Sequence, residues 1–184
     1  MLIFLFIQSV LCIESIRSIL EKPEFDFSLL TRKAFNSTED IGVLLSSDID
    51  HLIHSLVTDF PDILSLSSIG PSFEGRNISL LTLDARHHFV SSQYARGLQG
   101  RKGVNLTQIV DNELLQHWHQ QPGILLTGQI HPREMITASM VMYSLLKLLH
   151  GALNNDLKAK KLLEQNKYYF MPIVNVDGAK LIEE

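Results

Sequence analysis

One segment constrains the fold more than any other: an apolar run of strand length, then four polar residues, then an apolar helix. The run covers residues 123–130, and its nearly continuous apolar character suits a central strand that is covered on both faces. Residues 135–149 are apolar nearly all round, which predicts a buried helix that ends near Gly151. The polar tetrad HPRE at 131–134 therefore lies at the carboxyl end of a strand, where open α/β sheets gather ligands.

A second strand and helix follow this unit in the chain. Asn155 and Asp156 predict the cap of a helix that runs to about Gln165. The apolar residues 168–174 then predict another strand, which ends in the sequence NVDG at 175–178. Asparagine and aspartate before glycine are ordinary turn formers, so these four residues on their own predict only a turn. The alternation predicts two parallel strands in an α/β sheet.

The segment upstream predicts an amphipathic helix and a hairpin. Apolar residues recur at helical spacing from Ser46 until Phe60, where the following proline stops the pattern. Residues 63–69 and 78–83 predict two strands joined by a turn rich in glycine and proline. The long polar stretch 85–121 is interpreted as a loop insertion, because loops of this length are uncommon unless they are functional or disordered.

Charge and composition exclude several classes of protein. The 184 residues include 16 basic and 20 acidic side chains, so the formal net charge of −4 offers no electrostatic footprint for nucleic acid. A hydrophobic content of 45% is too high for intrinsic disorder and predicts one globular domain with a substantial core. Cys12 is the one cysteine of the sequence, so no disulfide forms within the chain, and we assign it no role as nucleophile or zinc ligand.

The amino terminus predicts export. Residues 1–13 form an apolar run that is too short to span a bilayer and fits a signal peptide, which leaves no stable membrane span after cleavage. A buried amino-terminal strand or helix is the alternative. Sequons at Asn36, Asn77 and Asn105 support a secreted or lumenal glycoprotein. Residues 14–45 show no sustained period and are interpreted as a prosegment or a loosely attached, linker-like arm.

His131 and Glu134 are the candidate metal ligands. They are three residues apart across the turn between strand and helix, so an imidazole nitrogen and a carboxylate are expected to converge on one cation, and zinc accepts this donor set. The spacing alone is weak evidence, because roughly 0.4 His-x-x-Glu matches are expected by chance in a chain of this composition. The alternative is a solvated surface loop in which Glu134 favours the amino end of the helix. The histidine pairs His51/His54 and 117/119 are more typical of surface residues.

Three segments resemble one known family. IGPSFEGRNI at 69–78, TGQIHPRE at 127–134 and MPIVNVDG at 171–178 are similar, in this order, to the zinc carboxypeptidases of the carboxypeptidase A and B type. The resemblance covers roughly residues 48–181 and is specific because the three segments are collinear. It implies an α/β fold whose mixed, mostly parallel sheet is flanked by helices. It also implies a secreted metallopeptidase that removes the carboxy-terminal residues of peptides and proteins.

By this match His131 and Glu134 are zinc ligands and Arg133 helps to bind substrate. The family places its third zinc ligand, a histidine, and its general-base glutamate beyond the matched segment. Residues 46–184 are therefore expected to be the amino-terminal portion of a carboxypeptidase domain, with an incomplete fold and no catalytic residue within the chain. The prediction is a zinc metallocarboxypeptidase by family whose chain alone is inactive, with no prediction of oligomeric state.

Two alternative functions remain open. The first is a noncatalytic binding or regulatory fragment of the same family, which pairs its incomplete sheet with another chain. The second is an unrelated α/β domain with a hydrolytic or nucleotide-binding function. Neither a Gly-x-Ser-x-Gly sequence nor a glycine loop that cradles phosphate supports the second.

Overall fold

The computed structural model describes residues 15–30, 43–85 and 122–184. The described strands form one mixed sheet in the order β1-β2-β4-β3. Their bounds are β1 Leu64–Pro71, β2 Asn77–Leu83, β3 Gly123–Thr127 and β4 Lys167–Met171. The predicted hairpin is confirmed as β1 paired with β2, and the predicted parallel pairing is confirmed between β3 and β4. Within the described sheet, the pairings β1–β2 and β2–β4 are antiparallel, so the sheet is mixed but not mostly parallel.

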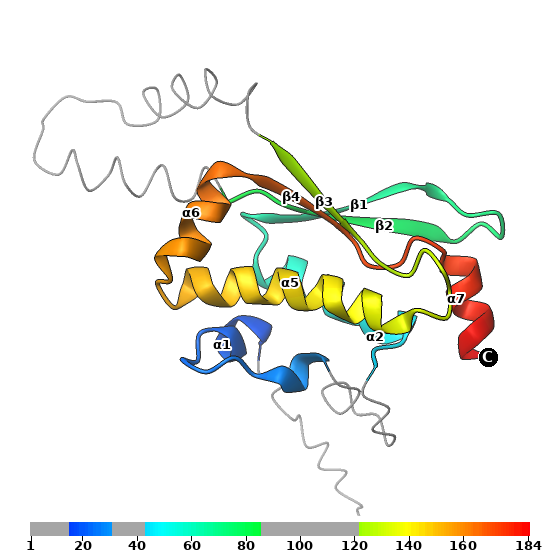
Figure 1. The fold of residues 1–184 in the computed structure, drawn as a ribbon, viewed down its shortest axis with the longest axis horizontal. Helices are drawn as coiled ribbons and strands as arrows, with labels where there is room; N and C mark the ends of the chain where they lie inside the picture. Colours follow the sequence, from blue (N-terminus) through cyan, green and yellow to red (C-terminus); the bar gives the residue numbers. More distant parts are fainter. Residues whose placement is uncertain (1–14, 31–42, 86–121) are drawn as a thin grey trace, which may run out of the picture.

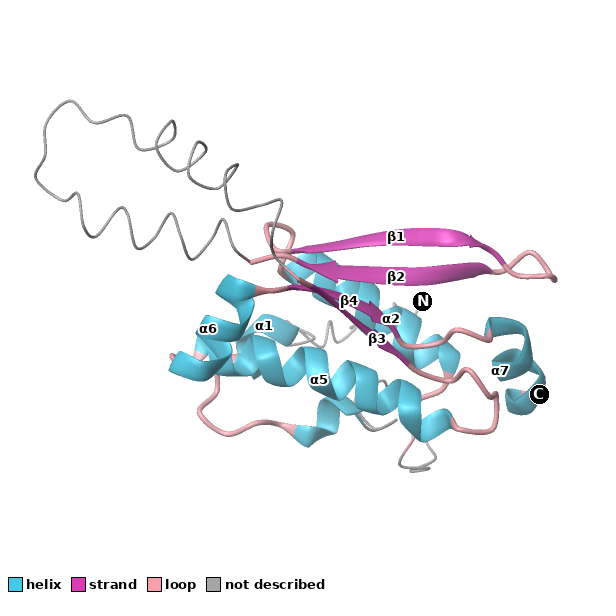
Figure 2. Ribbon diagram, turned by 45° about the horizontal axis from the view of Figure 1, so that its top comes forward, coloured by secondary structure: helices cyan, strands magenta, loops and turns pink. Residues whose placement is uncertain are grey.

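Helices cover one face of this sheet (Figures 1 and 2). The helical segments are α1 Ile16–Leu20, the 3-10 turn η1 Phe27–Leu30, α2 Ser46–Asp59, α5 Met135–Leu153, α6 Leu157–Gln165 and α7 Val176–Glu183. The core lies between the sheet and helices α2 and α5, where Leu56, Met142 and Phe170 are fully buried. Helix α5 is long and apolar enough to cross a membrane by length and composition, yet in this fold it contributes much of the core.

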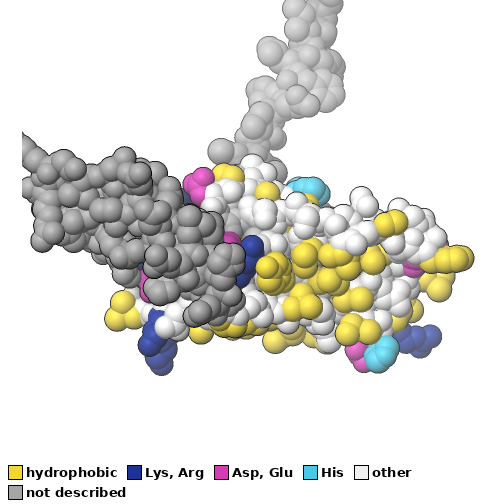
Figure 3. Space-filling view, turned by 90° about the horizontal axis from the view of Figure 1, so that it is seen from above, with side chains coloured by type: hydrophobic (Ala, Val, Ile, Leu, Met, Phe, Trp, Pro, Cys, Tyr) yellow, Lys and Arg dark blue, Asp and Glu magenta, His cyan; other side chains and the backbone are white. Residues whose placement is uncertain are grey.

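The opposite face of the sheet is open in the described residues. Register places Leu125 beside Tyr169, which in turn lies beside Thr82, so these three residues share one face. Figure 3 shows this face, with hydrophobic side chains gathered over the strands. The expectation of a central strand covered on both faces is therefore wrong for the described fold. Among the described strands β3 lies at the edge of the sheet, and Leu125 is 57% exposed.

Two further expectations need correction. Gly151 does not itself end α5, which continues to Leu153; it instead contacts α6. A Cβ atom at Gly151 would lie 2.7 Å from the Cβ of Ala159, so the missing side chain lets the two helices approach. The sequence NVDG at 175–178 is not an isolated turn, because Asn175 accepts the Gly178 N–H and caps α7.

The described part of the predicted arm packs on the core rather than hanging loosely. Ile16 and Leu20 of α1 are buried, and Leu20 is only 1% exposed. Arg17 holds this segment to the end of α2, since its guanidinium donates to the Asp59 carbonyl at 2.7 and 3.0 Å. The same guanidinium lies 4.5 Å from the centre of the Phe60 ring. The interpretation of residues 14–45 as a prosegment stays a prediction.

We expect Leu20→Ala to lower the free energy of unfolding by about 2–5 kcal/mol, as for other leucines removed from a core. A loosely attached arm would make the same change nearly neutral. Urea unfolding followed by circular dichroism measures the difference. The neighbouring exposed residue provides the control, because Glu21→Ala removes no buried surface and is expected to stay within about 0.5 kcal/mol of the wild type.

Candidate metal-binding site

The candidate site is built where the chain leaves β3 and β4. Pairing continues past both strands: Gly128 N–H donates to the Met171 carbonyl at 3.0 Å, and Val174 N–H donates to the Gly128 carbonyl at 3.1 Å. Asn175 N–H then donates to the Gln129 carbonyl at 3.2 Å. The two loops therefore run side by side at the carboxyl ends of two parallel strands, which is where α/β sheets place ligands.

Gly128 allows this close approach. A Cβ atom at this position would lie 2.6 Å from the Pro172 carbonyl oxygen and 2.9 Å from the backbone of Thr137. Both neighbours are backbone atoms that belong to a loop and a helix, so they have little freedom to retreat. Residue 128 is therefore a glycine because the loop after β4 and the first turn of α5 both press against it.

Gln129 turns the chain toward the tetrad. Its φ of 46° lies in the left-handed region, which is uncommon for residues other than glycine. Its backbone N–H donates to the Thr137 hydroxyl at 2.8 Å, and its side-chain amide donates to the Pro132 carbonyl at 2.9 Å. The residue is only 3% exposed. No pattern in the sequence indicates a role for Gln129, yet its buried amide fixes the turn that carries the candidate ligands.

His131 and Glu134 lie next to each other, as expected from their spacing. Glu134 N–H donates to the His131 carbonyl at 3.1 Å, and the Thr137 hydroxyl donates to the Glu134 carbonyl at 2.6 Å. Nδ1 of His131 lies 3.2 Å from Oε1 of Glu134, with the two side chains 77% and 54% exposed. Both donors therefore sit together at the surface, in contact with solvent.

This separation fits a shared zinc ion. Nitrogen and oxygen ligands at about 2.0–2.1 Å in a tetrahedral site are separated by roughly 3.3 Å. The same distance also suits a direct hydrogen bond between imidazole and carboxylate, so geometry alone leaves both roles open. No group of three or more potential ligands (His, Cys, Asp, Glu) was found in the described ranges 15–30, 43–85 and 122–184. Arg133, between the pair, is exposed.

Asp177 joins the hairpin turn to the first turn of α7, a role that was not predicted from the sequence. Its carboxylate accepts from the Ser72 hydroxyl at 2.7 Å and from Glu74 N–H at 3.1 Å. It also accepts from the Arg76 guanidinium at 2.7 Å. Because Ser72 and Asp177 are 105 positions apart, local spacing carries no signal of this contact. The one local signal for Asp177 is its position in the first turn of a helix, where acidic residues are favoured.

Helix α7 also touches the tetrad. Gly178 lies so close to Pro132 that a Cβ atom at position 178 would overlap Cγ of the proline ring. Of the three segments that carry the family resemblance, the one at 171–178 thus contacts both of the others, at 69–78 and at 127–134. Residues distant in sequence form one structural unit.

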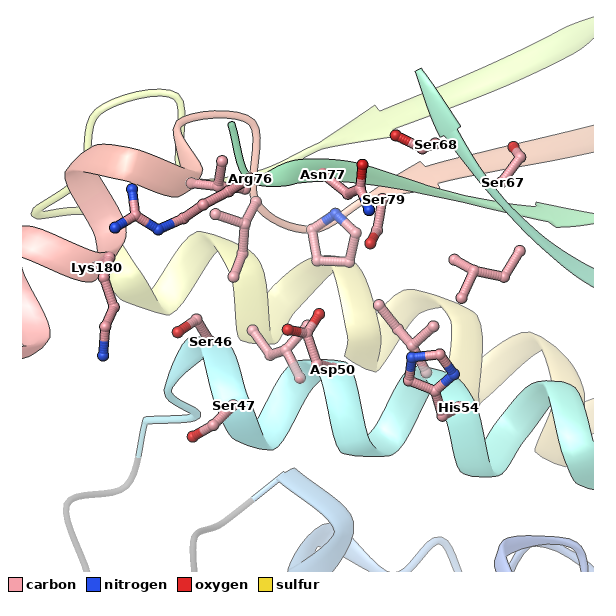
Figure 4. A pocket seen from close by; sticks show the side chains of 16 residues that line it. Ser46, Ser47, Asp50, His54, Ser67, Ser68, Arg76, Asn77, Ser79 and Lys180 are labelled. Carbon is pink, nitrogen blue, oxygen red and sulfur yellow. The ribbon is translucent and has the colours of Figure 1, made fainter. Parts of the chain in front are cut away.

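A separate open cavity lies between α2, the hairpin and α7 (Figure 4). Its volume is about 670 Å³, and its lining includes Asp50, His54 and Lys180. None of the tetrad residues lines it, so it is distinct from the candidate metal-binding site. His51 and His54 lie on the exposed side of α2 as expected, and the pair 117/119 lies outside the described residues.

Residues 49–184 match the family model described as zinc carboxypeptidase. Carboxypeptidase B of Astacus astacus is 28% identical over 131 residues, which cover 71% of this chain and 32% of the relative. The crystal structure of thrombin-activatable fibrinolysis inhibitor superposes with a TM-score of 0.55 at 15% identity, covering 91% of this chain and 33% of that one. Carboxypeptidase A from Helicoverpa armigera gives a TM-score of 0.50 at 19% identity, with coverages of 84% and 31%. The matched part of the chain thus spans about a third of the length of each of these proteins.

The Asp177 network makes stability depend on pH. The hydrogen bond from Ser72, assisted by Arg76, lowers the pKa of Asp177 below its ordinary value of 3.8. The stabilisation is therefore complete above that ordinary value and is lost as the pH falls through the lower pKa of the folded state. We expect Asp177→Asn to reduce the loss of stability between about pH 5 and pH 2, measured by urea unfolding at each pH. Asp62→Asn replaces an exposed aspartate and is the control: its free energy of unfolding should change with pH as in the wild type. The prediction is contradicted if Asp177→Asn also keeps the wild-type dependence on pH.

Proposed function

The chain belongs to the zinc carboxypeptidase family, and on that premise we propose that His131 and Glu134 are two protein ligands of a Zn²⁺ ion. The reaction we assign is the hydrolysis of carboxy-terminal peptide bonds, with peptides and proteins as substrates. The observation that carries the proposal is that a pair only 3.2 Å apart, His131 Nδ1 and Glu134 Oε1, lies in the loop after β3 within the segment that matches the zinc carboxypeptidase family.

The loop after β3 holds His131 and Glu134 in place and provides the negative charge of the Glu134 carboxylate. When bound, zinc polarises a carbonyl group and lowers the pKa of a bound water toward 7. Nδ1 of His131 and the carboxylate of Glu134 face each other on a turn whose backbone is fixed by Gln129 and Thr137. Little reorganisation of the backbone is then needed for both groups to bind one ion, which favours binding.

Arg133 is proposed to bind substrate. It lies between the two candidate ligands in sequence and its side chain is exposed. A guanidinium presents a planar fork of donors that suits a carbonyl or carboxylate oxygen of a peptide. This placement would bring the peptide group close to the metal without using either ligand.

The chain by itself is proposed to be a weak zinc binder without turnover. A catalytic zinc site normally has three protein ligands and a water molecule, and the described residues provide only the pair. We propose that the general base and the third ligand come from sequence that corresponds to the remaining two thirds of the relatives. Measured zinc stoichiometry near one together with release of carboxy-terminal amino acids would overturn this.

Export is part of the same proposal. Residues 1–13 are proposed as a signal peptide, residues 14–45 as a prosegment and residues 46–184 as the amino-terminal portion of the enzyme domain. Asn77 lies exposed on β2, where a glycan at its sequon would meet solvent. The sequons at positions 36 and 105 and the interpreted insertion 85–121 lie outside the described residues, except for position 85 itself.

Removing either ligand tests the metal assignment. We expect His131→Ala and Glu134→Gln each to weaken Zn²⁺ binding at least about tenfold, because even loss of a group that only orients a ligand costs 10–100-fold. Isothermal titration with Zn²⁺ measures the affinity. The stability of both variants should stay close to that of the wild type, because both side chains are exposed.

His51→Ala is the matched control, since it removes an exposed histidine from α2 and leaves the tetrad intact. Its zinc affinity should equal that of the wild type. If all three variants bind zinc equally well, or if only His51→Ala loses binding, the assignment to His131 and Glu134 is wrong.

A noncatalytic binding fragment is the second candidate, and the edge strand favours it. In the described sheet β3 pairs with β4 on one side only, and Leu125 is exposed on the open face. An unpaired strand edge beside an apolar face is a template for pairing with another chain. This function would use β3 as an interface rather than use the tetrad as a metal site.

Self-association tests this second candidate. If β3 is an interface, the purified chain should form a concentration-dependent oligomer in light scattering after size exclusion, and Leu125→Asp should restore a monomer. Leu157→Asp is the control, since it places the same charge at an exposed leucine of α6. A wild-type chain that stays monomeric and well behaved at all concentrations removes the basis of this candidate.

A further inference from the structure

Helix α7 is anchored at both ends by carboxylates. At its amino end Asp177 accepts from Ser72, from the Glu74 N–H and from Arg76 of the hairpin turn. At its carboxyl end Glu183 accepts from Ser46 N–H at 2.7 Å and from the Ser46 hydroxyl at 2.5 Å. The two anchors bind different elements, since the first connects α7 to the hairpin and the second connects it to α2. Figure 1 shows α7 at the end of the sheet where the loop after β3 turns into α5.

The amino end of α7 is also the end that reaches the candidate ligands. Gly178 follows Asp177 directly and packs against the ring of Pro132. On its other side Pro132 is held by Gln129, whose amide donates to the proline carbonyl at 2.9 Å. Pro132 is therefore held between α7 and the buried Gln129 side chain.

A shift of this proline would be passed on to its neighbours. The pyrrolidine ring fixes φ near −65°, so ring and backbone move together. His131 is bonded directly to Pro132, and Glu134 closes the same turn through its N–H bond to the His131 carbonyl. A displacement of α7 that moved the proline ring would therefore also move the backbone that carries the imidazole and the carboxylate.

We propose that Asp177 is a positioning residue for the candidate metal-binding site. By fastening the first turn of α7 to the hairpin turn, Asp177 holds Gly178 against Pro132 and so sets the spacing between His131 and Glu134. This inference rests on the proposed function for its role in zinc binding, whereas the effect on His131 exists with or without a metal.

The test compares the two anchors of α7 in the full chain. Asp177→Ala releases the anchor next to Pro132, and Glu183→Ala releases the anchor at the far end of the same helix. Both remove one acidic side chain with at least two hydrogen bonds, so they form a matched pair for general loss of stability. Asp177→Asn keeps an oxygen that accepts from Ser72 and serves as the conservative variant.

Two readouts separate positioning from stability. The first is the ring signal of His131 in histidine-labelled, metal-free protein, identified by its absence in His131→Ala. It is expected to shift in Asp177→Ala, to return toward the wild-type position in Asp177→Asn and to stay unchanged in Glu183→Ala. The second is Zn²⁺ affinity by titration, which should fall about tenfold in Asp177→Ala and stay within about twofold in Glu183→Ala.

Equal effects of the two alanine variants on both readouts, or no effect of Asp177→Ala, would overturn the positioning role. If the His131 signal responds selectively but the wild type binds no zinc, the positioning stands and the proposed function fails. If zinc binds equally to the wild type and to Asp177→Ala, the proposed function stands and the positioning role fails. Should Asp177→Ala not fold, Ser72→Ala removes a single bond of the same anchor and must shift His131 in the same direction.

Discussion

The close approach of the two loops beyond β3 and β4 is the constraint on which the site depends. Gly128 lies between the Pro172 carbonyl and the first turn of α5, with no room for a side chain. The backbone hydrogen bonds that flank it keep the loops in register after the strands have ended. Directly after this contact Gln129 takes a left-handed conformation, and its side-chain amide donates to the Pro132 carbonyl inside the tetrad. The local geometry of the candidate ligands is thus a consequence of sheet pairing and one missing Cβ atom.

The same region explains why three separate segments carry the resemblance to zinc carboxypeptidases. Asp177 connects the segment at 171–178 to the one at 69–78, and Gly178 connects it to Pro132 in the segment at 127–134. Each segment alone contains ordinary turn residues, and only the three segments together indicate the family. A motif of this kind is recognisable as a whole because all its parts serve one contact network, although a single segment predicts no more than a turn.

The helices and strands could be predicted from the sequence better than the contacts between distant segments. Helix α2, the hairpin, the cap of α6 at Asp156 and the parallel pairing of β3 with β4 follow from periodicity and capping, which are local properties. The juxtaposition of His131 and Glu134 follows from a spacing of three residues across a turn. The edge position of β3, the bond from Ser72 to Asp177 and the burial of Leu20 depend on contacts between distant segments, for which one sequence holds no local signal.

The described fold orients the two candidate ligands but leaves them exposed to solvent. His131 is 77% exposed, and β3, the strand that leads to it, has one open edge and one open face. Metal-assisted hydrolysis relies on a shaped site in which water is largely excluded, because electrostatic interactions are stronger at low dielectric. The nearly continuous apolar run of β3 is the pattern of a strand covered on both faces, and the relatives are about three times as long as the matched part. If His131 and Glu134 serve in hydrolysis, this exposed surface would have to be covered by further polypeptide to give such a site.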